Sequence, residues 1–303
     1  MRLALLFSGQ GNQQTEHWTR LLQSISDTEQ TALRASIPEI YATPLPGAED
    51  LQRNRVAQPF IFTYQMDLWR QLAKRLPRPV CAAGYSLGEM AACAAAGAFS
   101  ITEGIELCAE RADAMDRCVD SPVGLLAIKG LSPDAVAQIT QNHGLVLAIT
   151  NGPDHFVLGG KSAALQEAEA VALSMGANRA IRLGVTTPSH THWLERATGE
   201  MRGHLNGLVP NRLLFPVFSA IDGRSSRDFE EAMAALAKQI STPLNWKACL
   251  EAVYEMRPNL VLEIGPGNAL ARMWDECGYD IPARATDDFK TLDGILRWVE
   301  SKA

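Results

Sequence analysis

Residues 80–98, VCAAGYSLGEMAACAAAGA, decide the fold of this chain. The first four are small and apolar, as in a buried strand, and the segment from Glu89 onward has the composition of a closely packed helix. Between them lies a Gly-x-Ser-x-Gly turn, Gly84 to Gly88, centred on Ser86. Such a turn reverses the chain sharply and holds the serine in a strained conformation at a helix N-terminus. Because backbone N–H groups there favour negative charge, the pattern predicts that Ser86 is a nucleophile.

Apolar segments typical of further buried strands lie on both sides of this stretch. Together with the strand of residues 80–98, the expected buried strands are Leu3–Phe7, Val80–Ala83, Phe215–Ser219 and Leu260–Ile264. They alternate with helical stretches, which predicts an α/β fold with a mainly parallel sheet and a hydrolase-like core. Ligands of such sheets bind at the carboxyl ends of the strands, so we expect the functional site at the glycine-bearing turns that follow them.

The middle of the chain has a different pattern. Strands are expected at Gly124–Lys129, Leu145–Thr150, His155–Leu158 and Arg179–Leu183, with helices after Ser132 and over Ser162–Met175. That order, βαββαβ, is the ferredoxin-like plan. We therefore expect a small ferredoxin-like α+β domain over residues 121–186, inserted into a large α/β catalytic domain formed by residues 1–120 and 187–303.

The composition limits the class of protein. Of the 303 residues, 47% are hydrophobic and 20% are charged, as in folded proteins. A formal net charge of −6 gives no overall basic field for nucleic acid. The apolar run at the N-terminus is too short for a signal peptide or a membrane span, and the six cysteines have no zinc-type spacing. We expect a cytoplasmic protein with reduced thiols and with neither a nucleic-acid nor a membrane partner.

A serine nucleophile needs a base to accept its proton, because a neutral hydroxyl reacts poorly at pH 7. The six histidines are at positions 17, 143, 155, 190, 192 and 204. His143 and His155 fall in the inserted segment, whereas the pattern alone does not separate His190, His192 and His204. A metal site using His190 and His192 is an alternative, but no third ligand is evident.

Arg111 is expected on the apolar face of a helix. Ser100 and Glu103 have the spacing of a capping box, which predicts a helix from there to about Cys118. Arg111 lies three or four residues from apolar side chains in that helix. A guanidinium held there needs an anionic partner, since burying it alone is costly. The partner is either a neighbouring Asp or Glu or the carboxylate of a ligand.

Further motifs follow one another in order along most of the chain. They are Phe7-Ser8-Gly9-Gln10-Gly11-Asn12-Gln13, Gly84-Tyr85-Ser86-Leu87-Gly88-Glu89, Arg111, Pro188-Ser189-His190, Gln239 followed by Pro243 and Trp246, and Leu262-Glu263-Ile264-Gly265-Pro266-Gly267. In this series the chain resembles the malonyl-CoA:acyl-carrier-protein transacylase family, which includes the acyltransferase domains of polyketide and fatty acid synthases.

The resemblance implies a role for particular residues. It makes His190 the general base for Ser86, oriented by the backbone carbonyl of Gln239 rather than by an acidic side chain. It also makes the backbone N–H of Gln10 an oxyanion donor beside that of Leu87, the residue after the nucleophile. From the residues alone, the glycines around Gln10 indicate a tight turn equally well.

The resemblance also implies a substrate and a reaction. Arg111 matches the residue that selects malonyl groups by binding their free carboxylate. The malonyl group of malonyl-CoA passes to Ser86 and then to the phosphopantetheine-type thiol of an acyl carrier protein, with no metal and no cofactor of the enzyme's own. Arg179 and Arg182 are candidates for substrate phosphates, although solvated surface charge explains them as well.

Three substitutions set the chain apart from the usual family pattern. Tyr85 stands where a histidine commonly precedes the serine, Ser8 replaces a proline, and Asn245 replaces an arginine before Trp246. The segment between Ile37 and Val56 is also short, with Pro44, Pro46 and Gly47. These features resemble the malonyltransferase (epsilon) subunit of bacterial malonate decarboxylase, so other subunits of that complex are expected partners. The alternative is a malonyl transacylase of fatty acid or polyketide synthesis.

A serine esterase is the competing interpretation from another mechanistic class. It predicts an acidic residue as third member of a triad and an oxyanion loop with several glycines after a histidine, and no such loop is evident. It also leaves Arg111 without a function. A non-catalytic relative is less consistent with the sequence, because both Ser86 and His190 are present.

Overall fold

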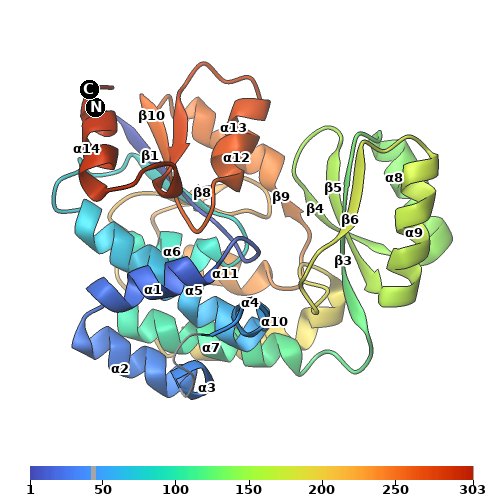
Figure 1. Cartoon of the computed structure of the whole chain (residues 1–303), viewed down its shortest axis with the longest axis horizontal. Coiled ribbons are helices and arrows are strands. Elements are labelled where there is room, and N and C mark those ends of the chain that lie inside the picture. Colours follow the sequence, from blue (N-terminus) through green and yellow to red (C-terminus); the bar gives the residue numbers. More distant parts are fainter. Residues whose placement is uncertain (42–45, 303) are drawn as a thin grey trace.

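Two sheets organise the molecule (Figure 1). The computed structural model describes residues 1–41 and 46–302, so Pro44 of the short segment lies outside the described residues. The larger sheet has six strands, and its neighbouring strands are parallel apart from the last pair. In spatial order they are β11 (Ala283–Ala285), β10 (Leu260–Ile264), β1 (Leu3–Phe7), β2 (Cys81–Gly84), β7 (Val217–Phe218) and β8 (Ser225–Ser226). The predicted α/β fold with a mainly parallel sheet is confirmed.

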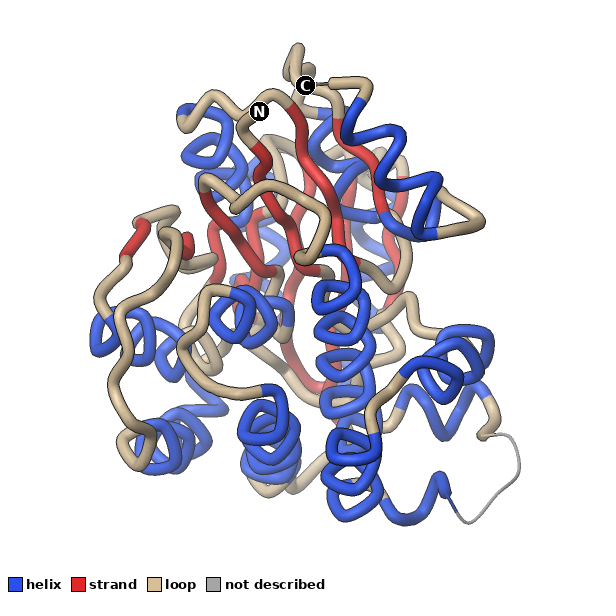
Figure 2. Tube along the Cα trace, turned by 90° about the vertical axis from the view of Figure 1, so that its left-hand side faces the viewer, coloured by secondary structure: helices blue, strands red, loops and turns tan. Residues whose placement is uncertain are grey.

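Strand β1 is buried on both faces, which explains its unbroken apolar sequence. Leu3, Leu5 and Phe7 belong to one core cluster, whereas Ala4 and Leu6 belong to a second cluster. This division follows from the alternation of side chains across a strand. The sheet therefore separates two cores, with helices over each face, as Figure 2 shows around the strands.

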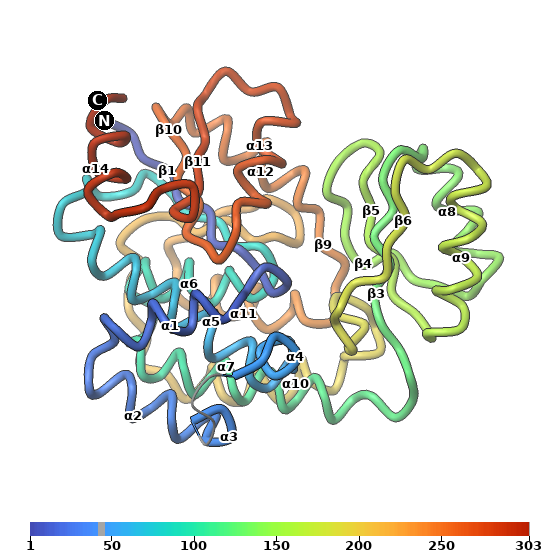
Figure 3. The backbone as a smooth tube through the Cα atoms, viewed as in Figure 1, coloured from blue at the N-terminus to red at the C-terminus, as the bar shows by residue number. Residues whose placement is uncertain are grey.

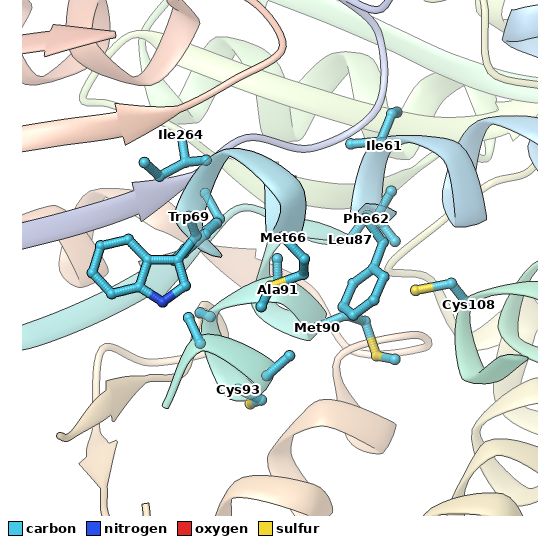
Figure 4. Packing of buried hydrophobic residues seen from close by; sticks show 14 of the residues in the cluster. Ile61, Phe62, Met66, Trp69, Leu87, Met90, Ala91, Cys93, Cys108 and Ile264 are labelled. Atoms are coloured by element: carbon cyan, nitrogen blue, oxygen red, sulfur yellow. The ribbon is translucent and has the colours of Figure 1, made fainter. Parts of the chain in front are cut away.

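The helices of the first core come from both halves of the chain. They are α1 (Thr15–Ser24), α2 (Asp27–Ser36), α3 (Pro38–Tyr41), α4 (Ala48–Gln52), α5 (Asn54–Leu72), α6 (Gly88–Ala95), α7 (Ile101–Asp116), α10 (Glu195–Leu205), α11 (Phe229–Lys238) and α14 (Leu292–Glu300). The opposite face is covered by α12 (Trp246–Glu255) and α13 (Ala269–Glu276). Figure 4 shows part of the first core, where Phe62 and Met66 of α5 pack near Leu87 and Met90.

Helices α5 and α7 approach each other closely because of one glycine. A Cβ at Gly104 would lie 2.1 Å from Cζ of Phe62, so no larger residue fits there without moving the ring. Gly104 and Arg111 are two turns apart on α7, on the same side of the helix. The close approach at Gly104 thereby brings Arg111 against α5.

The segment between α7 and α10 forms a separate unit beside the large sheet (Figures 1 and 3). It contains β3 (Val123–Lys129), α8 (Pro133–His143), β4 (Val146–Thr150), β5 (His155–Lys161), α9 (Ser162–Ser174) and β6 (Arg179–Arg182). The strand order is β6-β3-β5-β4, and these neighbours are antiparallel. The element order βαββαβ is as expected, whereas the domain limits of 121–186 stay a prediction.

A short strand joins this unit to the rest of the chain. β9 (Leu244–Asn245) lies just before α12 and pairs in parallel with β4, with Ile149 opposite Leu244. The smaller sheet therefore has a fifth strand from outside the inserted segment. Two 3₁₀ turns complete the description, η1 (His192–Leu194) and η2 (Thr286–Asp288).

Helix α5, with 19 residues, is the longest helix in the described ranges. Neither it nor any other helix within residues 1–41 and 46–302 has the length and apolar character needed to cross a membrane.

Candidate active site

Ser86 lies in the turn between β2 and α6, where the sequence predicts it. Its φ of 54° is in the left-handed region, a strained conformation for a residue with a side chain. A Cβ at Gly84 would lie 2.1 Å from the backbone nitrogen of Glu89, and one at Gly88 would lie 2.0 Å from the carbonyl oxygen of Phe7. The turn thus requires both glycines of the Gly-x-Ser-x-Gly pattern.

His190 makes hydrogen bonds through both of its ring nitrogens. Nδ1 lies 2.6 Å from the backbone carbonyl oxygen of Gln239, and Nε2 lies 2.8 Å from Oγ of Ser86. Since a carbonyl only accepts, Nδ1 carries the proton and Nε2 is free to accept the proton of the serine hydroxyl. The backbone N–H of His190 also donates to Ile240 O at 2.8 Å, and the residue has a φ of 65°. Backbone carbonyl groups therefore hold both the ring and the main-chain N–H of this histidine.

Gln239 contacts both members of this pair. While its carbonyl oxygen orients His190, its side-chain Nε2 donates to the carbonyl oxygen of Ser86 at 2.9 Å. The family resemblance implied only the contact of the Gln239 backbone carbonyl with His190. The side-chain bond ties the strained turn to the segment that orients the histidine.

The surroundings keep His190 neutral. Burial lowers its pKa to about 3, and the nearby Arg111 charge acts in the same direction, although the hydrogen bond to the Gln239 carbonyl raises it. A neutral imidazole at physiological pH is the form that accepts a proton from a hydroxyl.

Two backbone N–H groups lie at the turn without an acceptor in the described part of the chain, those of Gln10 and Leu87. Leu87 is the N-cap of α6, where helical geometry leaves such groups unbonded. Gln10 follows Gly9, and a Cβ at Gly9 would lie 2.8 Å from the carbonyl oxygen of Tyr85. The loop after β1, which carries Gln10, therefore lies against the serine turn, which is followed by Leu87.

Arg111 reaches the nucleophile from α7. Its side chain is only 2% exposed; Nη1 donates to Oε1 of Gln58 at 2.6 Å, and Nη2 lies 3.5 Å from Oγ of Ser86. Its Nε has no hydrogen-bond partner among the described residues, and no carboxylate of those residues forms an ion pair with the group. A neighbouring Asp or Glu as the partner is thus not found.

Arg111 keeps its charge despite this burial. Burial lowers its pKa to about 10, and Cys108 and Glu89 oppose the shift. A buried cation with free donors, aimed at the nucleophile, is suited to bind an anionic group of a substrate.

Sequence reasoning missed Gln58, the protein partner of Arg111. Its own Nε2 donates to Oδ1 of Asn54 at 2.6 Å. Asn54, Gln58 and Gln65 occupy positions i, i+4 and i+11 of the largely apolar α5, and all three are buried. Amide side chains at helical spacing in an otherwise apolar segment are the pattern that could have indicated this row of buried polar residues on α5.

Glu89 was also missed, although it belongs to the motif. It lies one turn beyond Ser86, is 1% exposed, and accepts a hydrogen bond from the Ala220 N–H at 3.1 Å. Burial raises its pKa to about 8, while the Ala220 bond and the Arg111 charge lower it. At neutral pH it is largely protonated, so it competes little with a substrate anion for Arg111.

The other candidate residues lie apart from this site. His192 is exposed and does not form a metal cluster with His190; no group of three or more His, Cys, Asp or Glu suited to hold a metal occurs in the described residues. His204 faces Glu110 at 3.5 Å. Arg182 pairs with Glu169 at 3.2 Å on the surface of the inserted unit, which favours the interpretation as solvated surface charge.

The three departures from the family pattern each have a structural place. The Tyr85 ring packs edge-on against buried Trp246, with centroids 5.3 Å apart. Asn245 caps α12 by accepting from the Ala248 N–H at 3.1 Å. The carbonyl oxygen of Ser8 accepts from the buried Gln65 amide at 2.7 Å.

Comparison with known proteins assigns the family. Residues 5–286 match the model of the acyl transferase domain family. The chain belongs to this acyltransferase family. The malonyl CoA-acyl carrier protein transacylase of Haemophilus influenzae is similar, with 26% identity over 97% of this chain and 98% of that protein.

Solved structures agree with this assignment. The acyl-carrier-protein S-malonyltransferase of Burkholderia pseudomallei has a TM-score of 0.87 and 28% identity, covering 98% of this chain and 100% of that one. A malonyl-transacylase solved in complex with a type II polyketide synthase acyl-carrier protein has a TM-score of 0.87 and 26% identity, covering 98% of this chain and 99% of that one.

Proposed function

We propose that this acyltransferase moves a malonyl group from malonyl-CoA to the prosthetic-group thiol of an acyl carrier protein, through an ester on Ser86. One observation carries the choice of substrate. The buried Arg111 has free donors and lies 3.5 Å from the nucleophile, where a short acyl group with a terminal carboxylate can reach it. The names of the similar proteins support the same substrate and the same kind of acceptor.

The first half-reaction acylates the serine. His190 Nε2 takes the proton of Ser86 as Oγ attacks the thioester carbon, and the N–H groups of Gln10 and Leu87 donate to the oxyanion. When the tetrahedral intermediate collapses, the C–S bond breaks and the proton on His190 passes to the coenzyme A thiolate. Arg111 binds the malonyl carboxylate throughout.

The second half-reaction is the reverse with a new thiol. The carrier's phosphopantetheine-type thiol gives its proton to His190 and attacks the ester carbonyl of malonyl-Ser86. The C–O bond breaks, and the proton returns to Oγ. Residues of the chain handle each proton and charge in these steps, so the proposal includes neither a metal ion nor a cofactor of the enzyme's own.

The identity of the carrier is the finer part of the proposal. The similar proteins named above act on acyl carrier proteins, which favours fatty acid or polyketide synthesis over malonate decarboxylase. We therefore take an acyl carrier protein of those pathways as the acceptor. The malonate decarboxylase carrier, the other subunits of that complex and a cytoplasmic location stay predictions from the sequence alone.

The experiment is intact-protein mass spectrometry after incubation with malonyl-CoA or acetyl-CoA, with Ser86→Ala as the control. We expect a malonyl adduct on the natural protein, much less acetyl adduct, and none on Ser86→Ala. The adduct is then offered holo acyl carrier protein or the holo carrier subunit of malonate decarboxylase, and the faster acceptor identifies the pathway. Hydrolysis of simple esters without an adduct from malonyl-CoA would instead support a serine esterase.

A further inference from the structure

The loop after β1 is clamped to α4 by hydrogen bonds of its side chains. We call residues 8–13 the oxyanion loop. Gln13 is the centre of the clamp: it is 3% exposed, and its Oε1 accepts from the Gly11 N–H at 2.8 Å. Its Nε2 donates to Leu51 O at 3.0 Å and to Oε1 of Gln52 at 2.9 Å. The direction of the amide is thereby defined, because its oxygen meets a donor and its nitrogen meets two acceptors.

A second glutamine of the loop uses the same helix. Nε2 of Gln10 donates to Gln52 O at 3.0 Å. Leu51 and Gln52 are the last two residues of α4. The last carbonyl groups of a helix accept no hydrogen bond from within that helix. The two glutamine amides therefore satisfy carbonyls that the short helix leaves unbonded. Three hydrogen bonds therefore join the loop to α4, and a fourth, between Gly11 and Gln13, lies within the loop.

The start of α5, just after α4, is anchored to α7, the helix that carries Arg111. Asn54, the first residue of α5 and two residues after α4, donates to Ala112 O at 3.3 Å and to Asp116 at 2.9 Å, both on α7. Gly11 has a φ of 135°, which is open mainly to glycine, so the loop needs outside support to keep this shape. The clamp provides that support from α4, which directly precedes α5, the helix whose Gln58 contacts Arg111.

From this geometry we propose that Gln13 is a positioning residue that sets the oxyanion loop for catalysis without touching the substrate. The inference rests on the proposed function, in that the Gln10 N–H stabilises the oxyanion. Gln13 fixes Gly11 on one side of Gln10, and the close contact of Gly9 with the serine turn fixes the other side. Releasing the clamp moves the donor away from the place where the charge develops, which slows acylation and leaves ground-state binding intact.

The test uses the nearly isosteric Gln13→Glu. Its carboxylate still accepts from Gly11 but turns an oxygen toward the two acceptors of α4, so it repels them. The matched control is Gln23→Glu on the exposed face of α1. Single-turnover acylation of Ser86 is measured with malonyl-CoA and, independently of malonyl recognition, with p-nitrophenyl acetate. The Kd of malonyl-CoA is measured by calorimetry on Ser86→Ala, with and without Gln13→Glu.

We expect Gln13→Glu to lower the acylation rate by about 10–100-fold with both acyl donors, less than the roughly 10²–10³-fold loss of a complete oxyanion donor. The Kd should stay within about threefold, since the binding groups are not moved. Adding Gln52→Lys to Gln13→Glu supplies a cation for the new carboxylate and should restore part of the rate. A rescue of this kind separates positioning from general destabilisation, which it would not repair.

Each other outcome has a defined meaning. An unchanged acylation rate in folded Gln13→Glu, or a rise in Kd as large as the loss of rate, overturns the inference. If the natural protein reacts with p-nitrophenyl acetate but not with malonyl-CoA, the proposed function fails while the clamp is still judged from the ester. If neither reagent acylates the natural protein, both proposals fall. Should Gln13→Glu not fold, Gln52→Ala takes its place, because it removes one acceptor of Gln13 Nε2. A slower acylation with an unchanged Kd then supports the clamp, and an unchanged rate counts against it.

Discussion

The two ends of the site are held in different ways. At the Ser86–His190 end, the histidine is bound by two backbone carbonyls, and the serine by a turn that tolerates only glycine at its flanks. At the Arg111 end, the guanidinium is oriented by the side chain of Gln58, which is in turn held by Asn54. Both ends are buried, and they meet at Oγ of Ser86.

This difference separates chemistry from selection. The contacts that His190 makes with the Gln239 and Ile240 carbonyls come from the backbone, so a side-chain substitution at either position does not remove them. Contacts made by side chains change with a single substitution, so the arginine end is where the acyl group accepted can change while the catalytic pair stays intact. The comparison predicts that the two ends can be broken independently.

The largest effect is expected from the histidine. His190→Asn keeps a residue type that tolerates a positive φ but removes the base, and we expect acylation by malonyl-CoA and acetyl-CoA to fall alike, by roughly 10³–10⁶-fold. His192→Asn, at the exposed histidine two residues later, is the matched control and should keep nearly full activity. Single-turnover mass spectrometry measures both. A loss confined to malonyl-CoA would mean that His190 binds the substrate instead of acting as the base.

The next effect should appear at the other end and should be selective. Arg111→Ala removes the cation that meets the malonyl carboxylate, a charged contact worth about 1.5–3 kcal/mol for each hydrogen bond. We expect the preference for malonyl-CoA over acetyl-CoA to fall by about 10²-fold, from competition between the two thioesters, while acetyl transfer is retained. Equal loss with both thioesters would show that the two ends are not independent.

At the catalytic end, the serine turn was predictable from the sequence because local rules govern it, whereas His190 and Gln239 were indicated only by the family resemblance. A strand–turn–helix with two glycines admits few structures, and β1 and β10 have the limits that their apolar runs indicate. The smaller strands were not predictable. β9 has two residues and exists because β4 of a distant segment pairs with it, and β7 is shorter than the apolar segment around it.

The arginine end was predictable only in part. The apolar surroundings of Arg111 indicated a buried cation, but its partner is on another helix, and nothing in the local pattern of α7 specifies Gln58. That pairing depends on the approach of α5 and α7 at Gly104, which is a tertiary feature. Likewise, the clamp at Gln13 joins segments 38 and 39 residues apart.

A smaller and equally selective effect is expected from Gln58→Glu. The new carboxylate would pair with Arg111 and compete with the malonyl group for the same donors, so we expect the KM for malonyl-CoA to rise by about tenfold. Acetyl-CoA should react at an unchanged rate, because it has no carboxylate to displace. Gln23→Glu, on the exposed face of α1, is the control. A fall in kcat for both thioesters would place Gln58 among the groups that support catalysis.

The smallest expected change is in the pH dependence of acylation, and it tests the catalytic end alone. The base acts in its neutral form, and burial lowers the pKa of His190 to about 3. The rate should therefore change by less than about threefold between pH 8 and pH 5. An imidazole of ordinary pKa, about 6.5, would lose roughly 30-fold over that range.

The same lowered pKa of His190 should leave the acylation rate nearly independent of pH but make the stability of the fold depend on pH. Measuring the stability therefore checks that the pKa of His190 is low. Between pH 6.5 and 3 the unfolded chain binds a proton at His190 that the folded chain does not, so this residue stabilises the fold above pH 6.5 and the contribution is lost as the pH falls. In urea unfolding, the free energy of unfolding of the natural protein should therefore fall relative to that of His190→Asn as the pH is lowered from 7 to 5. If instead the acylation rate halves near pH 6.5 and this difference in unfolding free energy stays constant, the imidazole is solvated, and the backbone-held end is less closed than the arginine end opposite it.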